Sequence, residues 1–245
     1  MNTTNAKPSE ANRNTAIIVG ILYIIGTVAG ILSFAFALPL LGDPGYLSKI
    51  AANENPIIIG CLLVLTMGFA LAMVPVWLFP ILKRQNEALA LGYVVFRGAL
   101  ETVAYIATAI CWMFLMVVSH ESVTAGAANL PYFQTLGAVL LKGNDSISNI
   151  LVIIFSVDAL ILYYLLYRSK LIPRWISVWG FIAILLHFST AFLIMFHIVD
   201  AGMSVTTGII NFPIFLQEMV MAVWLIAKGF DPVAIADLSA RAYTN

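Results

Sequence analysis

The chain has 245 residues, of which 62% are apolar and only 10% charged, and its formal net charge is zero. A soluble globular domain is nearer half apolar and a quarter charged, so a water-soluble fold is excluded. The absence of a basic patch or tail gives no indication of nucleic-acid binding. The apolar runs are long enough for helices that cross a bilayer, and they lack the alternating pattern of a membrane β-barrel. We therefore expect an all-α, polytopic membrane protein.

The first apolar run, residues 15–41, is longer than the roughly 7–15 apolar residues of a signal peptide, so we interpret it as a retained helix. Five more runs of suitable length follow, at residues 56–82, 88–118, 146–167, 174–197 and 204–228. We predict one domain over residues 1–245, folded as a bundle of six transmembrane helices, with short polar tails at 1–14 and 229–245.

Two connections need comment. Residues 119–145 contain "LPYFQTLGAVLLKG", which is too short and interrupted to span a bilayer but apolar enough to lie at its interface. At the other end of the chain, Pro232 is expected to end the last helix near the membrane surface, because proline cannot donate a backbone hydrogen bond.

The lysines and arginines outside the spans are distributed unevenly. Cytoplasmic segments retain such residues, so their positions predict orientation. Lys49 and Lys142 fall on one predicted side, and nine fall on the other, namely Lys7, Arg13, Lys83, Arg84, Arg168, Lys170, Arg174, Lys228 and Arg241. We therefore predict that both termini are cytoplasmic.

The third span carries two charges, Arg97 and Glu101, inside "YVVFRGALETVAY". A charge at the centre of a bilayer costs about 2.5–3.5 kcal/mol, whereas an ion pair one helical turn apart contributes only about 0.2–0.5 kcal/mol. The local pair therefore cannot offset its own burial. Both side chains should face the protein interior or water and have partners on other helices.

Depth identifies candidate partners, because a helix rises about 1.5 Å per residue. Arg97, Asp158 and Glu218 lie about 15 Å from the predicted cytoplasmic edge, and Glu101 and His187 about 20 Å. Since the hydrocarbon core is about 30 Å thick, these residues share a layer near its centre. Helical spacing places Tyr105 on the face of Arg97 and Glu101, and Asn211 on the face of Glu218. The candidate binding residues are Arg97, Glu101, Tyr105, Asp158, His187, Asn211 and Glu218.

Two interpretations of this polar layer remain open. Intramembrane ionisable groups are by default candidates for a substrate, ion or proton site. Alternatively, Arg97 pairs with Glu101 and Glu218 only to fix helix packing, and His187 alone is an ordinary hydrogen-bonded packing residue. Three carboxyls facing one arginine and one histidine favour function. Like charges crowded at low dielectric repel each other, so at least one carboxyl should be protonated or hydrated.

Other chemistry lacks support in the sequence. No spacing of His, Cys or carboxylate residues demands a metal, and no hydrolase, nucleotide-binding or redox motif is present, so we expect no cofactor. Cys61 and Cys111 are interpreted as small packing residues that could touch each other. Gly26 and Gly30 form a GxxxG motif, which favours close packing within the bundle, with homodimerisation as the alternative.

Several stretches resemble a known family, among them "VGILYIIGTVAGI", "LFPILKRQNEALALGYVVFRGALETV", "LLYRSKLIPRWISVWGFIA" and "FLQEMVMAVWLIAKGFDP". These resemble the bacterial integral-membrane family known as domain of unknown function 4386, over nearly the whole chain. The resemblance implies six helices in the bacterial cytoplasmic (inner) membrane, and it implies no reaction. The family pattern matches Arg97, Glu101, Arg168, Pro173, Arg174, Trp175, Glu218 and Lys228; Asp158 matches no motif.

Three functions follow as hypotheses. The first is a small transporter-like or ligand-binding protein whose acceptors are Glu101 and Glu218, with Arg97 as counter-ion and membrane lipids, an unknown small molecule or a proton as partners. The second is a structural or accessory membrane protein in which the polar layer only locks the helices. The third is an intramembrane enzyme that acts on lipid, which requires the carboxylates to reach a lateral opening; no motif supports it.

Overall fold

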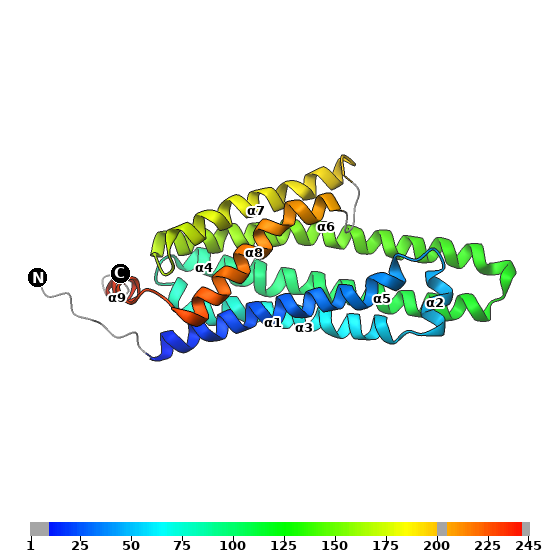
Figure 1. The fold of residues 1–245 in the computed structure, drawn as a ribbon, viewed down its shortest axis with the longest axis horizontal. Helices are drawn as coiled ribbons and strands as arrows, with labels where there is room; N and C mark the ends of the chain where they lie inside the picture. Colours follow the sequence, from blue (N-terminus) through cyan, green and yellow to red (C-terminus); the bar gives the residue numbers. More distant parts are fainter. Residues whose placement is uncertain (1–9, 200–204, 242–245) are drawn as a thin grey trace, which may run out of the picture.

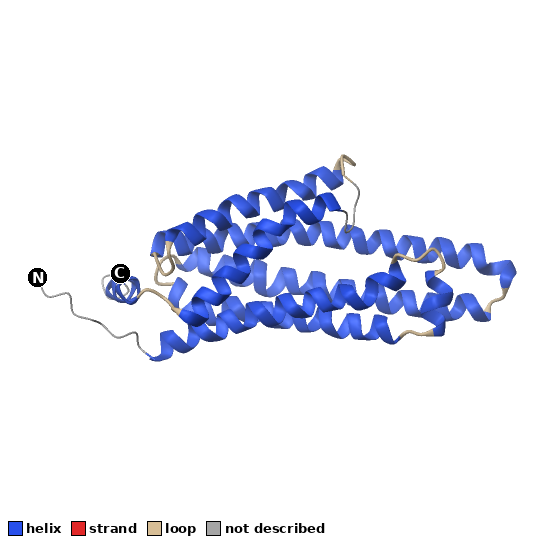
Figure 2. Cartoon of the chain, viewed as in Figure 1, coloured by secondary structure: helices blue, strands red, loops and turns tan. Residues whose placement is uncertain are grey.

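The computed structural model describes residues 10–199 and 205–241, and in these ranges the chain is helical without a strand (Figures 1 and 2). The elements in chain order are α1 Glu10–Leu41, α2 Tyr46–Ala52, α3 Asn55–Leu82, α4 Glu87–Tyr93, the π-helix η1 Val94–Leu100, α5 Glu101–Thr124, the short 3-10 helix η2 Ala127–Asn129, α6 Leu130–Ser169, α7 Arg174–Met195, α8 Val205–Ala227 and α9 Pro232–Arg241.

Six helical stretches of the described chain are long and apolar enough to cross a membrane: α1, α3, the continuous run from α4 through η1 to α5, α6, α7 and α8. The predicted fold class, an all-α bundle with six transmembrane helices, is therefore confirmed. Long apolar runs identify such helices reliably because a helix is one of the few structures that pairs every backbone group inside lipid. The protein is a multi-pass membrane protein.

Most of the predicted connection at residues 119–145 is helical. Residues 130–145 are the first part of α6, which runs without a break for 40 residues to Ser169. At 1.5 Å per residue this helix is about 60 Å long, about twice the thickness of a hydrocarbon core. In Figure 1, α5 and α6 extend together past the end of α1, so the apolar segment of the connection belongs to a helical hairpin. Tyr46 of α2 packs against Gly137 on α6, where an added Cβ would collide with its hydroxyl.

The prediction that Pro232 ends the last helix is wrong, because α8 ends at Ala227 and Pro232 begins a further helix, α9. The Oδ1 atom of Asp231 caps the first turn of α9 by accepting from the amides of Val233 and Ala234, both at 2.9 Å. Phe230, Ala234, Ile235 and Leu238 are buried against the bundle. The short amphipathic pattern that packs α9 in this way is easily mistaken for a polar tail.

The helix α1 already includes Glu10, so part of the predicted polar tail at 1–14 is helical. Arg13 of α1 donates from Nη1 to the carbonyl of Leu225 at 3.1 Å and from Nη2 to that of Ile226 at 2.6 Å. These carbonyls belong to the last turn of α8, where the helix carries the negative end of its dipole, and that of Leu225 also accepts from the amide of Gly229 at 3.1 Å. Arg13, which the sequence analysis used only to predict orientation, therefore also connects α1 to α8.

Glycines allow α1 to approach its neighbours closely. A Cβ on Gly26 or Gly30 would lie 2.6 Å from the side chain of Leu71 or Met67 on α3. The GxxxG motif therefore packs within the chain, as predicted. On the other side of α1, a Cβ on Gly20 would lie 2.6 Å from the carbonyl oxygen of Ala222 on α8.

The helices form an elongated bundle, with the start of the first described helix and the last described helix at one end. In Figure 1 the start of α1 and α9 lie at the same end, and α8 crosses α1 near that end and then diverges from it. Gly20 marks this crossing, because it contacts the backbone of α8 directly. Beyond the crossing, residues of both α1 and α8 line the cavities described below.

Replacing Gly20 should therefore destabilise the bundle. For Gly20→Ala we expect a loss of about 1–3 kcal/mol in the free energy of unfolding, because the new methyl group meets backbone that cannot rotate away. The matched control is Gly143→Ala on α6, where an added Cβ has no neighbour within 4 Å. It should be neutral or stabilise by about 0.5–1 kcal/mol through helix propensity. Unfolding of both variants in mixed micelles measures this difference, and equal effects would contradict the proposed helix crossing.

Candidate functional site

Arg97 lies in an unusual segment of helix. Residues 94–100 form a π-helical stretch within the otherwise continuous helix of residues 87–124, and Arg97 is its only charged residue. π-helical turns are rare and are found frequently at functional sites, because the wider turn shifts the side chains that follow it. The guanidinium of Arg97 is only 2% exposed, so nearly all of its interactions are with the protein.

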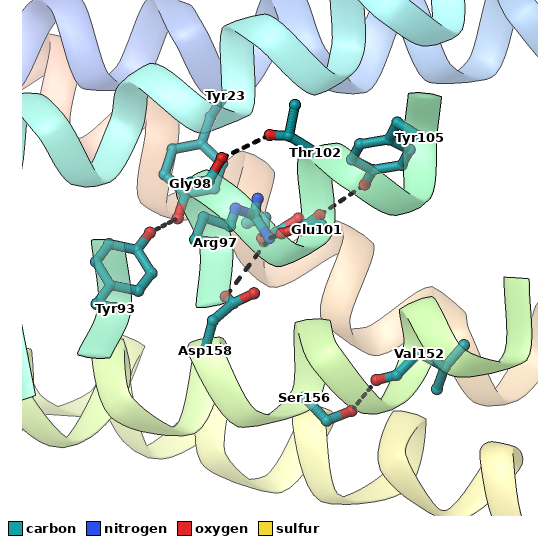
Figure 3. Close-up of polar contacts among 11 residues, drawn as sticks. Tyr23, Tyr93, Arg97, Gly98, Glu101, Thr102, Tyr105, Val152, Ser156 and Asp158 are labelled. Carbon is teal, nitrogen blue, oxygen red and sulfur yellow. Dashed lines mark hydrogen bonds and ion pairs between the residues drawn. The ribbon is translucent and has the colours of Figure 1, made fainter. Parts of the chain in front are cut away.

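Three carboxyl groups from three segments surround this guanidinium, and Figure 3 labels two of these residues, Glu101 and Asp158. Arg97 Nη1 lies 3.2 Å from Glu101 Oε2 and 3.7 Å from Asp158 Oδ1 of α6. Arg97 Nη2 lies 3.5 Å from Glu218 Oε1 of α8. We call Arg97, Glu101, Asp158 and Glu218 the Arg97 cluster. Its members come from sequence positions up to 121 residues apart, so it joins α5, α6 and α8 through one cation.

Aromatic rings complete the surroundings of Arg97. The guanidinium carbon lies 5.0 Å from the ring centre of Phe155 and 5.5 Å from that of Tyr23 on α1. A guanidinium over an aromatic face gains electrostatic attraction without another charge. Tyr23 is held in turn by a hydroxyl–hydroxyl contact of 3.2 Å with Tyr93. Sequence reasoning missed Tyr23, Tyr93 and Phe155; the one available signal was Tyr93, which lies four residues before Arg97.

Glu101 is oriented by Tyr105, one turn later on the same helix face. The Tyr105 hydroxyl donates to Glu101 Oε1 at 2.6 Å, and Figure 3 shows the ring pointing back along the helix toward the carboxylate. The ring itself is held against α3, where a Cβ on Gly68 would lie 3.0 Å from it. The predicted stripe of Arg97, Glu101 and Tyr105 is therefore one buried face.

The cluster contains more acid than base. Its three carboxyls and one guanidinium give a formal charge of −2 if all are ionised, and charge of this size is costly away from water. Within the described residues, Arg97 Nε and Asp158 Oδ2 are buried without a hydrogen-bond partner, and Glu101 Oε2 is held by its ion pair with Arg97 Nη1. The carboxyls of the network therefore have unused hydrogen-bonding capacity and can take up a proton.

A small cavity of about 240 Å³ lies directly against the cluster. Arg97, Glu101 and Glu218 line it together with Tyr105 and His187, and its remaining walls are mainly apolar side chains of α1, α3 and α6. Asp158 does not line it. Asp158 is only 1% exposed and contacts Arg97 from the α6 side, so it supports the guanidinium rather than the cavity.

A second, larger cavity of about 880 Å³, which we call the chamber, adjoins the first. Both cavities are lined by Thr27, Met67, Phe155, His187 and Glu218. The chamber continues between α1 and α8 over mainly apolar side chains. Glu218 therefore stands where the charged cluster meets an apolar space, and its side chain is 16% exposed, against 1–2% for the other three members.

His187 and Asn211 form a separate polar pair at the same junction. His187 Nδ1 lies 2.8 Å from Asn211 Oδ1, and the imidazole packs edge-on against Phe155 with ring centres 5.2 Å apart. Both residues line the chamber, but among the described hydrogen bonds, ion pairs and ring contacts neither residue contacts Arg97. The predicted layer is thus two groups of residues, one around Arg97 and one around His187, linked by Phe155 and Glu218.

Other polar residues at similar positions along the helices are excluded from the site. Gln217 is fully buried and accepts from Tyr163 at 2.6 Å while donating to the carbonyl of Ile176 at 3.1 Å, which fixes α8 against α6 and α7.

Cys61 and Cys111 are free thiols, and Cys61 lies 3.7 Å from the carbonyl of Ala109. In the part of the chain that the structure describes, no group of three or more His, Cys, Asp or Glu side chains is arranged around a common metal position.

Comparison with known proteins identifies the sequence family of this chain. No curated protein and no solved structure matches it. The family model described as domain of unknown function (DUF4386) matches residues 18–229, a range that contains the whole Arg97 cluster, His187 and Asn211. The chain, a multi-pass membrane protein with six apolar helices, therefore belongs to the DUF4386 family.

Proposed function

We propose that this protein is a transporter-like, ligand-binding membrane protein, and that a small molecule occupies the inner cavity and the chamber. The observation that carries the proposal is the position of Glu218. It belongs to a buried ion-pair network, it lines both cavities, and its side chain is 16% exposed against 1–2% for the other members. A network built for packing alone has no need to present a charged group to an apolar chamber.

The arrangement divides the work among the residues. Arg97 is the counter-ion that keeps the carboxyls in place, and Asp158 holds it from α6. Glu218 and Glu101 are the acceptors offered to the inner cavity, with Tyr105 fixing Glu101. Because the carboxyls outnumber the guanidinium, a proton or a cationic group of the ligand would reduce the excess negative charge. If the cationic group of the ligand replaces a proton on a carboxyl, ligand binding is coupled to proton release.

The proposal includes an orientation. The start of α1 and α9 lie at the same end of the bundle, and Arg13, Arg84, Arg168 and Lys170 belong to helix ends or connections near it. Cytoplasmic segments retain lysine and arginine, so this end is assigned to the cytoplasm. The chain would then lie in the cytoplasmic membrane with both termini inside the cell.

A structural lock is the second candidate, and one observation favours it: Arg97 contacts carboxyls from α5, α6 and α8 at once. The two functions predict different effects of removing Glu218. In a lock, every ion pair stabilises packing, whereas in a binding site the exposed Glu218 contributes little to folding. The third hypothesis, a lipid-modifying enzyme, gains no support, because two of the three carboxyls are only 1% exposed.

Access to the cavities is tested first, with single cysteines in a background of Cys61→Ser and Cys111→Ser. We expect Thr27→Cys to react with a small charged methanethiosulfonate reagent, because Thr27 lines both cavities and a thiol ionises only where water reaches it. The neighbouring Val28→Cys is the matched control. Val28 is exposed on the surface of α1 and lines neither cavity, so it should stay unreactive in lipid.

Ser48→Cys on α2 serves as the reactive reference, since Ser48 is exposed outside the long helices. Labelling at Ser48→Cys with none at Thr27→Cys would contradict the proposed access and support a dry network. Equal labelling of Thr27→Cys and Val28→Cys would show only that the reagent reaches the helix surface, and it would contradict the cavity as the route.

The stability of two charge variants distinguishes a site from a lock. Arg97→Leu leaves three buried carboxyls without their cation, and removing one partner of a buried ion pair costs about 3–5 kcal/mol. Glu218→Gln keeps two of the three pairs and should cost about 0.5–1.5 kcal/mol. Unfolding free energies in mixed micelles measure both values. A loss at Glu218→Gln as large as that at Arg97→Leu would favour the lock.

A further inference from the structure

The chamber limits the chemistry of the molecule that it can hold, and the argument here rests on the proposed function. Its volume of about 880 Å³ is within the range of cavities that enclose drug-sized ligands. Most of its wall is apolar, from α1 residues such as Phe34 and Leu38 to α8 residues such as Ile214 and Phe215. A ligand that fills this space must therefore have an apolar body.

The polar end of the chamber favours a positively charged group. The Nη atoms of Arg97 already face carboxylates, Nη1 toward Glu101 and Asp158 and Nη2 toward Glu218. An anionic group would have to displace one of these carboxylates and would approach a cluster with excess negative charge. A cationic group instead meets the exposed oxygens of Glu218 and reduces that excess, and charge-assisted hydrogen bonds of this kind are the stronger ones.

The residues around Glu218 suit an ammonium group further. Asn211 Oδ1 can only accept, so His187 Nδ1 donates to it, and a neutral imidazole then keeps Nε2 as an acceptor. Phe34 and Phe215 also line the chamber, and aromatic rings can attract cations. An ammonium group would thus find one carboxylate, one imidazole and two further aromatic rings among the residues that line a single cavity.

The position of the chamber indicates how such a molecule would enter. Ile31 and Phe215 both line the chamber and are 55% and 37% exposed, so the chamber is open to the surroundings of the bundle on this side. The chamber wall is therefore continuous with the lipid-facing surface where the two helices diverge beyond Gly20 (Figure 1). Entry from the bilayer suits a molecule that already partitions into lipid.

From this geometry we infer that the chamber binds a small lipophilic amine, which enters between α1 and α8 and places its ammonium group against Glu218. Its apolar chain lies along Phe34, Ile214 and Phe215. Arg97 and its other carboxyls keep Glu218 in position and do not contact the amine. Neutral or anionic molecules of the same length lack the group that Glu218 recognises, so they should bind far more weakly.

The test uses the full-length protein in phosphatidylcholine nanodiscs with three probes of equal chain length: octylamine, octan-1-ol and octanoate. Binding is followed by the shift in melting temperature as each probe is titrated, with empty nanodiscs measuring partition into lipid. We expect octylamine to bind at least about tenfold more tightly than octan-1-ol. A hydrogen bond to a charged group contributes about 1.5–3 kcal/mol, and about 1.4 kcal/mol corresponds to a tenfold change in the dissociation constant.

Three variants locate the binding. Glu218→Gln should weaken octylamine binding about tenfold and leave octan-1-ol binding unchanged. Ala35→Phe fills the chamber without changing a charge, since Ala35 lines it, and should weaken octylamine binding as well. Val28→Phe adds the same ring on α1 outside both cavities and should bind octylamine as the unaltered protein does. Ala35→Phe keeps the test valid if Glu218→Gln folds poorly.

Each contrary outcome has one meaning. Tighter binding of octan-1-ol or octanoate, blocked by Ala35→Phe, overturns the amine assignment and leaves the proposed binding function standing. Octylamine binding that is equal in all variants is partition into lipid and overturns the inference. If no probe binds and Thr27→Cys is also unreactive, the proposed function fails, and the inference fails with it.

Discussion

The burial of one guanidinium is the constraint on which the rest of this structure depends. Arg97 cannot lie inside an apolar bundle without counter-ions, since an unpaired charge there costs far more than a local ion pair returns. Glu101 alone does not satisfy it, so Asp158 and Glu218 are drawn in from α6 and α8, and Tyr23 from α1. Helices distant in sequence are thereby fixed around one side chain.

The same constraint explains how a structural network can also be a binding site. Asp158 and Glu101 are sealed around Arg97, whereas Glu218 lies at the boundary between this network and the chamber. A carboxyl held by a buried cation on one side and open on the other is positioned before any ligand arrives, and such preorganisation lowers the cost of binding. The π-helical turn at Arg97 contributes to this positioning, because it changes the direction of the side chains around it.

Small residues determine where the bundle is tight and where it opens. Gly26 and Gly30 bring α1 against α3, and Gly20 brings it against the backbone of α8 at one end. Arg13 strengthens that end by capping the last turn of α8. α1 and α8 cross at this end and diverge beyond it, and the chamber lies between them (Figure 1).

The sequence by itself determined the six spanning helices and the residues that had to find partners. Apolar length identifies a spanning helix because lipid leaves the backbone no other partners, and the rise per residue gives the depth of Arg97, Glu101, Asp158 and Glu218. Depth, however, is one coordinate of three. Only the tertiary structure decided that Asp158 contacts Arg97 while His187 contacts Asn211, since this depends on the order and rotation of the helices.

The tertiary structure also decided what no residue pattern expresses. The π-helical stretch of residues 94–100 lies inside an apolar run that predicts an ordinary helix, and α6 begins at Leu130, where Tyr46 of α2 packs on Gly137. The sequence did not predict α9, because a ten-residue helix is marginally stable alone and forms only when its apolar face packs on another surface. The chamber is a space between helices, so its existence follows from where α1 and α8 meet and separate rather than from any segment alone.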